Sequence, residues 1–115
     1  PAEFKDITLS DYVGDRYTSL TDDPYQKGFV SNYARSHYSE DVAETGGRLI
    51  SLTLEEREAM IAKAGPVGGP LMRKKFDMLQ KWLKDSYGVD TERWCEIYHR
   101  RIAQLDNLDW ESLDE

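Results

Sequence analysis

The sequence has few of the residues on which many enzymes and metal sites depend. Its 115 residues include one cysteine and two histidines, and no stretch matches a catalytic or ligand-binding motif. A single cysteine excludes an internal disulfide bond and is compatible with a reducing compartment. With so few thiol and imidazole groups, a zinc site would have to recruit carboxylates, and nucleophilic hydrolase chemistry is disfavoured.

Long hydrophobic runs are also missing. No apolar stretch approaches the roughly 20 residues that a membrane-spanning helix needs. The first residues lack the basic and then apolar pattern of a secretory signal peptide. We therefore expect a protein of the cytoplasm or of a virion, without a membrane partner.

Positive charge is scarce. The chain has 15 Lys and Arg residues against 22 Asp and Glu residues, which gives a net charge of −7. Direct nucleic-acid binding is disfavoured, because it relies on basic groups that displace counterions from phosphates. The charge is uneven, since the residues from 106 onward carry five acidic groups and no basic one.

Two well-marked helical segments lie near the C-terminus. Pro70 suits a first helical position, and Gly88 can adopt the left-handed conformation that ends a helix. Asp90 is a suitable N-cap for a second helix that reaches about Leu108. Each segment repeats apolar residues at helical spacing, so we predict two antiparallel helices packed face to face. The stripes are Met72, Phe76, Leu79 and Leu83 in the first helix and Trp94, Ile97, Tyr98, Ile102 and Leu105 in the second.

Upstream signals are weaker. Residues 1–22 show no sustained periodicity and predict an irregular arm that wraps the core. The Asp23-Pro24 pair predicts a helix to Tyr38, and Thr45-Gly46-Gly47 predicts a break before a short extended piece at 48–52. Thr53 and Glu56 form a capping-box pattern, which predicts a helix over 54–64.

The glycine-rich segment 66–70 is predicted to connect two helices. Exposed glycine amides before a helix can also bind phosphate, but the Gly-Lys-Ser/Thr ending of a phosphate loop is absent.

These patterns together predict a mainly α protein with one small helical domain. It is built on the C-terminal antiparallel hairpin, with an irregular N-terminal arm and at most one short extended element. The predicted division is an arm at 1–22, a helical domain at 23–108 and an acidic tail at 109–115.

The first hairpin helix carries a second apolar face, which favours contact with another protein or with a second copy of the chain. Alternatively, the arm and the earlier helices cover this face. Arg101, a cation inside the apolar stripe of the second helix, would need a carboxylate partner. Trp110 could anchor the acidic tail. The candidate interface residues are Leu71, Met78, Trp82, Arg101 and Trp110.

Glu96 and His99 have the Glu-x-x-His spacing of di-iron helical bundles, and Cys95 lies one turn from the histidine. On a helical wheel the Glu96 and His99 pair lies opposite Trp94, so we expect both to face solvent and assign no metal ligand or catalytic residue.

The leading hypothesis is a non-enzymatic interaction or assembly subunit without a cofactor, such as an accessory or structural component of a virus particle or other complex. One alternative is a metal-binding homodimer that uses the Glu-x-x-His pair. Another is an acidic phage-type inhibitor whose surface imitates nucleic acid.

Overall fold

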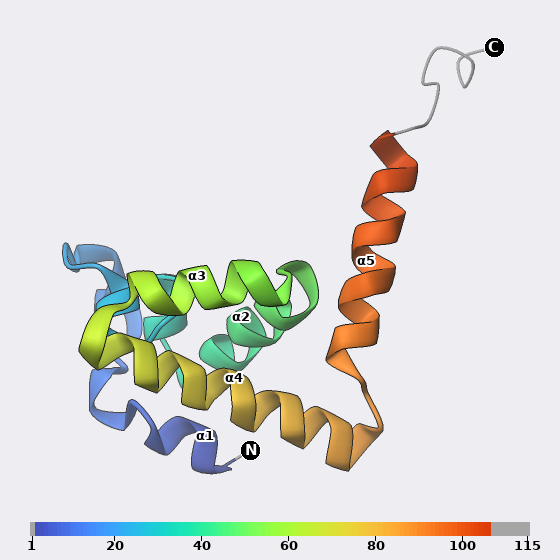
Figure 1. Cartoon of the computed structure of the whole chain (residues 1–115). Helices are drawn as coiled ribbons and strands as arrows, with labels where there is room; N and C mark the ends of the chain where they lie inside the picture. The colour runs from blue at the N-terminus through green and yellow to red at the C-terminus, as the bar shows by residue number, and fades with distance from the viewer. Residues whose placement is uncertain (1, 107–115) are drawn as a thin grey trace.

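The computed structural model describes residues 2–106, in which every regular element is a helix (Figure 1). The mainly α fold predicted from the sequence is therefore confirmed. The α-helices are α1 (Ala2–Asp6), α2 (Tyr38–Ser51), α3 (Leu54–Lys63), α4 (Gly65–Tyr87) and α5 (Thr91–Asp106). Four short 3-10 helices precede α2, namely η1 (Leu9–Asp11), η2 (Gly14–Ser19), η3 (Pro24–Lys27) and η4 (Tyr33–Arg35).

The predicted capping box starts α3. Thr53 Oγ1 accepts a hydrogen bond from the Glu56 amide at 3.1 Å, and Glu56 Oε1 accepts one from the Thr53 amide at 3.0 Å. The chain reverses at Gly65, whose φ of 80° favours glycine. Helices α3 and α4 consequently lie side by side (Figure 1).

Helix α4 begins earlier than predicted. Residues 66–70 form its first turns and are not a connector, and Pro70 lies inside the helix. Pro66 lies in the first turn, which tolerates proline because its amides have no partner within the helix. Gly68 and Gly69 are buried in this part of the helix, where neighbouring segments approach closely.

The junction between α4 and α5 has the predicted ends. Gly88 adopts a φ of 66°, and the Val89 amide donates to the Leu83 carbonyl oxygen at 3.1 Å. Asp90 Oδ1 accepts from the Glu92 amide at 3.1 Å. Helix α5 then turns away from α4 and packs chiefly against α2 (Figure 1). The antiparallel neighbour of α4 is therefore α3.

Residues 23–38 do not form the single helix that was predicted. The segment divides into η3 and η4, and Gly28 separates them with a φ of 87°. A β-carbon on Gly28 would lie 2.7 Å from Leu71 Cβ, so the backbone of this glycine packs directly against α4. Contact with α4 decides the conformation here.

The predicted break at Thr45-Gly46-Gly47 and the extended piece after it are also wrong. Both lie within α2, which continues to Ser51. Three residues four apart, Asp41, Thr45 and Leu49, are buried along one face of this helix. Packing of that face against the core outweighs the low helix propensity of two glycines.

The core lies where α2 and α4 meet the N-terminal arm. Phe4 of α1 is completely buried within it, so the N-terminal arm contacts the core, but α1, η1 and η2 give this arm helical turns where an irregular segment was predicted. The buried apolar cluster consists of Phe4, Val30, Leu49, Ala64, Met72, Phe76 and Leu79. None of the helices between residues 2 and 106 has the length and hydropathy needed to cross a bilayer. The predicted tail at 109–115 lies outside the described residues.

Candidate functional site

A buried polar cluster joins α4 to α2. Lys75 Nζ lies 2.7 Å from Asp41 Oδ2, and neither side chain is exposed to solvent. The Tyr12 hydroxyl donates to the same carboxylate oxygen at 2.7 Å, and the Thr45 hydroxyl donates to Asp41 Oδ1 at 3.2 Å. Loss of water raises the pKa of Asp41 and lowers the pKa of Lys75 from their ordinary values.

Three aromatic rings close around the Lys75 ammonium group. Its Nζ lies 3.8 Å from the ring centroid of Phe29, 5.9 Å from that of Phe4 and 6.0 Å from that of Tyr12. Ring faces attract cations, so these contacts hold the segments that carry Phe4, Tyr12 and Phe29 onto α4. Because solvent does not reach the pair, its role is structural.

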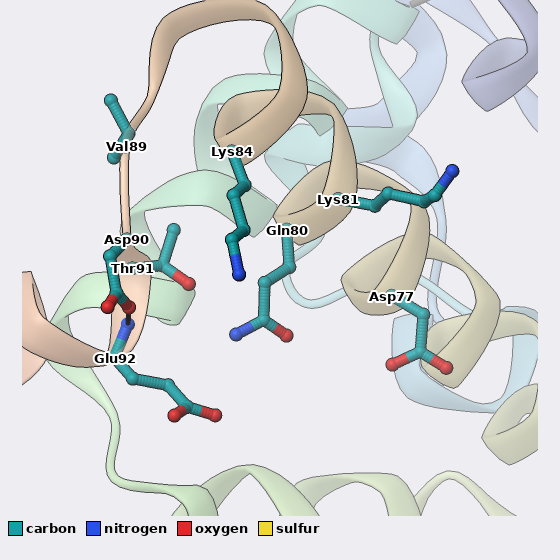
Figure 2. A pocket seen from close by; sticks show the side chains of 8 residues that line it. All are labelled: Asp77, Gln80, Lys81, Lys84, Val89, Asp90, Thr91 and Glu92. Atoms are coloured by element: carbon teal, nitrogen blue, oxygen red, sulfur yellow. Dashed lines mark hydrogen bonds between the residues drawn. The ribbon is translucent and has the colours of Figure 1, made fainter.

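A groove of about 440 Å³ lies at the junction of α4 and α5 (Figure 2). Lys84 and Gln80 extend from α4 beside the segment that carries Thr91 and Glu92 (Figure 2). The groove mixes acidic and basic groups and has neither a thiol nor an imidazole among its lining residues, so it does not suggest a reaction. Its walls are Asp77, Gln80, Lys81, Lys84, Val89, Asp90, Thr91 and Glu92.

A second groove, of about 360 Å³, separates the start of α3 from α5. Arg57 lines it and is only 7% exposed, yet its side chain takes part in no hydrogen bond or ion pair with residues 2–106. Its lining residues are Thr53, Leu54, Arg57, Glu92, Cys95, Glu96 and His99.

Sequence reasoning missed Arg57. Its position could have indicated a buried role, because it shares one face of α3 with apolar residues. These are Met60, Ile61 and Ala64, which follow it at helical spacing.

The candidate metal residues of α5 line this second groove. The Cys95 thiol donates to the Leu52 carbonyl oxygen at 3.1 Å, and burial raises its pKa, which disfavours the reactive thiolate. His99 is half-buried rather than solvent-facing, whereas Glu96 is exposed. No three His, Cys, Asp or Glu side chains within residues 2–106 are arranged to hold a metal ion.

The apolar face of α5 points away from the rest of the described chain. Trp94 is 53% exposed and Leu105 is 48% exposed, with Tyr98 and Ile102 between them at 40% and 41%. We call these four residues the α5 stripe. The sequence prediction placed this stripe in a contact with α4, but the buried residues of α5 are Thr91 and Cys95, which lie one turn apart near its start. The predicted contact of this stripe with α4 is therefore wrong, because α5 packs chiefly against α2.

The predicted interface on α4 lies against its own chain. Leu71 contacts the Gly28 region, and Met78 and Trp82 are half-buried beside the core. Arg101 is exposed next to the α5 stripe, and Trp110 lies outside the described residues. An intermolecular role for these five residues stays a prediction.

A model of a protein family described as "Putative zinc-binding metallo-peptidase" matches residues 1–92. A crystal structure of a protein from Bacteroides caccae ATCC 43185, described in the same words, has the same fold with a TM-score of 0.84 and 28% sequence identity. The match covers 95% of this chain and 42% of that chain, so the present sequence spans less than half the length of that protein. No curated protein sequence matches this chain significantly.

These matches overturn the hypothesis of a non-enzymatic assembly subunit and the expectation of a structural or virion component. The prediction that the chain is not an enzyme is wrong for the same reason. That prediction rested on the few His and Cys residues and on the absence of catalytic motifs within 115 positions. A shortage of metal ligands in one segment does not exclude an activity whose ligands lie in another.

Proposed function

This chain belongs to the zinc-binding metallo-peptidase family, and from this premise we propose that it is a helical part of a zinc-dependent peptidase, which hydrolyses peptide bonds. The family match over residues 1–92 carries the proposal. The shared fold with the Bacteroides caccae protein supports it, because the similarity extends over nearly the whole chain.

The residues of this chain do not fit a zinc site by themselves. Peptidase zinc is commonly held by two histidines one helical turn apart, in the pattern His-Glu-x-x-His. This chain has only His37 and His99, and it lacks that pattern. His37 is occupied as the N-cap of α2, where its Nδ1 accepts from the Ser39 amide at 3.1 Å. We therefore propose that zinc ligands come from protein outside these 115 residues.

The α5 stripe is the surface that we propose packs against that other part of the peptidase. Its four side chains are large and apolar, and they extend over about three turns of a helix that projects from the body (Figure 1). Aromatic residues at such a density are typical of buried contacts. The unmatched 58% of the Bacteroides caccae chain provides the precedent for a further segment of sufficient size.

Replacing Trp94 and Tyr98 by alanine tests this contact. In the 115-residue chain, the free energy of unfolding should fall by less than about 1 kcal/mol, since both side chains are half exposed. In the full-length peptidase the same change should cost about 3 kcal/mol or more, because it truncates buried aromatic groups. Urea denaturation measures both values. Leu9→Ala, at a 56% exposed site away from α5, is the control and should be nearly silent in both proteins. Equal effects of the double variant in the two proteins would contradict the contact.

Metal removal tests the peptidase function. The full-length protein should bind zinc, cleave a mixed peptide library, lose that activity with a chelator and regain it with added zinc. The isolated 115-residue chain should retain far less than one zinc per molecule after dialysis. A zinc-loaded full-length protein that cleaves no peptide would overturn the function. One zinc bound per isolated chain would overturn only the proposed origin of the ligands.

A further inference from the structure

We propose that the groove between α3 and α5 binds the free C-terminal carboxylate of a peptide whose last side chain is apolar, and that Arg57 is the group that pairs with this carboxylate. Such binding would hold whether or not the protein hydrolyses peptides.

Arg57 is a buried cation in the wall of this groove. Its side chain is 7% exposed, and its Nε is buried without a hydrogen-bond partner among the described residues. The centroid of the Phe76 ring lies 5.9 Å from Arg57 Cζ, at the outer limit for a cation–π interaction. A guanidinium group has five N–H donors, and a buried charge without a partner is strongly unfavourable. A carboxylate in the groove would accept from the unpaired Nε and from one terminal N–H of the guanidinium.

The other polar groups around the groove are largely occupied. The Cys95 thiol donates to the Leu52 carbonyl oxygen, and the Thr53 hydroxyl accepts from the Glu56 amide. His99 is the exception, because its Nε2 is buried and has no partner within residues 2–106. The groove therefore offers a guanidinium fork and one imidazole nitrogen, a combination that suits a carboxylate.

The volume and the lining residues of the groove indicate what kind of side chain accompanies the carboxylate. Its volume of about 360 Å³ is near the lower end of the roughly 300–1,000 Å³ found for small-molecule pockets. An apolar surface is provided by Leu54, which is 59% exposed, and by the side chain of Cys95. A terminal residue with an aliphatic side chain would cover this surface while its carboxylate reaches Arg57.

Two acidic residues oppose binding of an anion. Glu92 and Glu96 line the groove from α5, and both are exposed. Neither forms an ion pair with Arg57, so the guanidinium remains available. Their repulsion would disfavour an anion without an apolar group, and Glu96→Gln should strengthen carboxylate binding several-fold.

The experiment is an NMR titration of the 115-residue chain with N-acetyl-leucine and with N-acetyl-leucinamide, which differ only at the carboxylate. We expect the acid to bind at least ten-fold more tightly than the amide, with shifts centred on Leu54, Cys95 and His99. Arg57→Lys should weaken binding of the acid at least ten-fold, because an ammonium group lacks the bidentate fork. The matched control is Arg73→Lys on α4, which alters the exposed ion pair with Glu58 and should leave binding unchanged.

Several outcomes would overturn the proposal. Equal affinities for the acid and the amide would show that the groove does not recognise the carboxylate. This comparison uses the unmodified chain and so does not depend on whether a variant folds. An affinity for acetate equal to that for N-acetyl-leucine would show that the apolar side chain does not contribute to binding. Tighter binding of N-acetyl-glutamate α-amide than of N-acetyl-leucine would show that the groove recognises a side-chain carboxylate and not a chain terminus. Shifts centred on the α4–α5 groove would exclude Arg57 as the site.

Discussion

Replacing Lys75 by methionine should lower the free energy of unfolding by about 3–5 kcal/mol, since it leaves a carboxylate buried without its counter-ion. The Lys75 ammonium lies 2.7 Å from Asp41 Oδ2, and solvent reaches neither side chain. Methionine keeps most of the side-chain volume, so the lost charge rather than a cavity accounts for the effect. Urea denaturation at pH 7 measures it.

The pH dependence of this variant provides a second test. Burial already raises the pKa of Asp41 in the folded protein, and loss of Lys75 should raise this pKa further. A carboxyl whose pKa is higher in the folded state binds more protons there, so folding becomes more favourable as the pH falls. The deficit of Lys75→Met should therefore shrink on acidification from pH 7 through the folded pKa of Asp41.

Lys74→Met is the matched control, because Lys74 is exposed on the same helix. It should change the free energy of unfolding by less than about 0.5 kcal/mol. A Lys75→Met deficit no larger than that of the control, or one that is constant with pH, would show that the pair contributes little.

Gly68→Ala should destabilise the protein by about 3 kcal/mol, the upper end of the range for an overpacked core. A β-carbon at this position would overlap the Tyr25 carbonyl oxygen and lie 2.7 Å from the Gln26 carbonyl carbon. Backbone atoms cannot rotate aside as a flexible side chain can, so η3 would have to move away from α4. Thermal or urea denaturation measures the loss.

Gly47→Ala gives the opposite expectation and serves as the control. Gly47 also lies inside a helix, but a β-carbon there would meet no atom within 4 Å. Alanine should stabilise α2 by roughly 0.5–1 kcal/mol through its higher helix propensity. If the two alanine variants were equally stable, close packing at Gly68 would not be important.

The helix ends that depend on local chemistry were predictable. The capping box of α3, the glycine end of α4 and the aspartate cap of α5 each involve hydrogen bonds between residues within about six positions of one another. Segments stabilised by distant contacts were mispredicted. Residues 45–47 are helical because one face of α2 packs on the core, and 23–38 is broken where Gly28 meets α4.

The buried charges were only partly visible. Lys75 and Arg57 each occupy a position within an apolar helical stripe, which is a recognisable anomaly in the sequence. Their surroundings were not predictable, because Asp41 lies 34 positions from Lys75 and the groove at Arg57 is formed with a helix much later in the chain. A cation within an apolar stripe therefore forms an ion pair at Lys75 and is an unpaired guanidinium at Arg57.

The sequence was enough to predict that this protein is helical and where several of its helices start and end, because caps and periodicity act over one or two turns. The tertiary structure decided which face of each helix is buried. It left the α5 stripe exposed and buried Cys95, which the sequence places only at the edge of that stripe. The physical reason is that an apolar stripe specifies burial but not the surface against which it is buried, and that surface depends on the path of the whole chain.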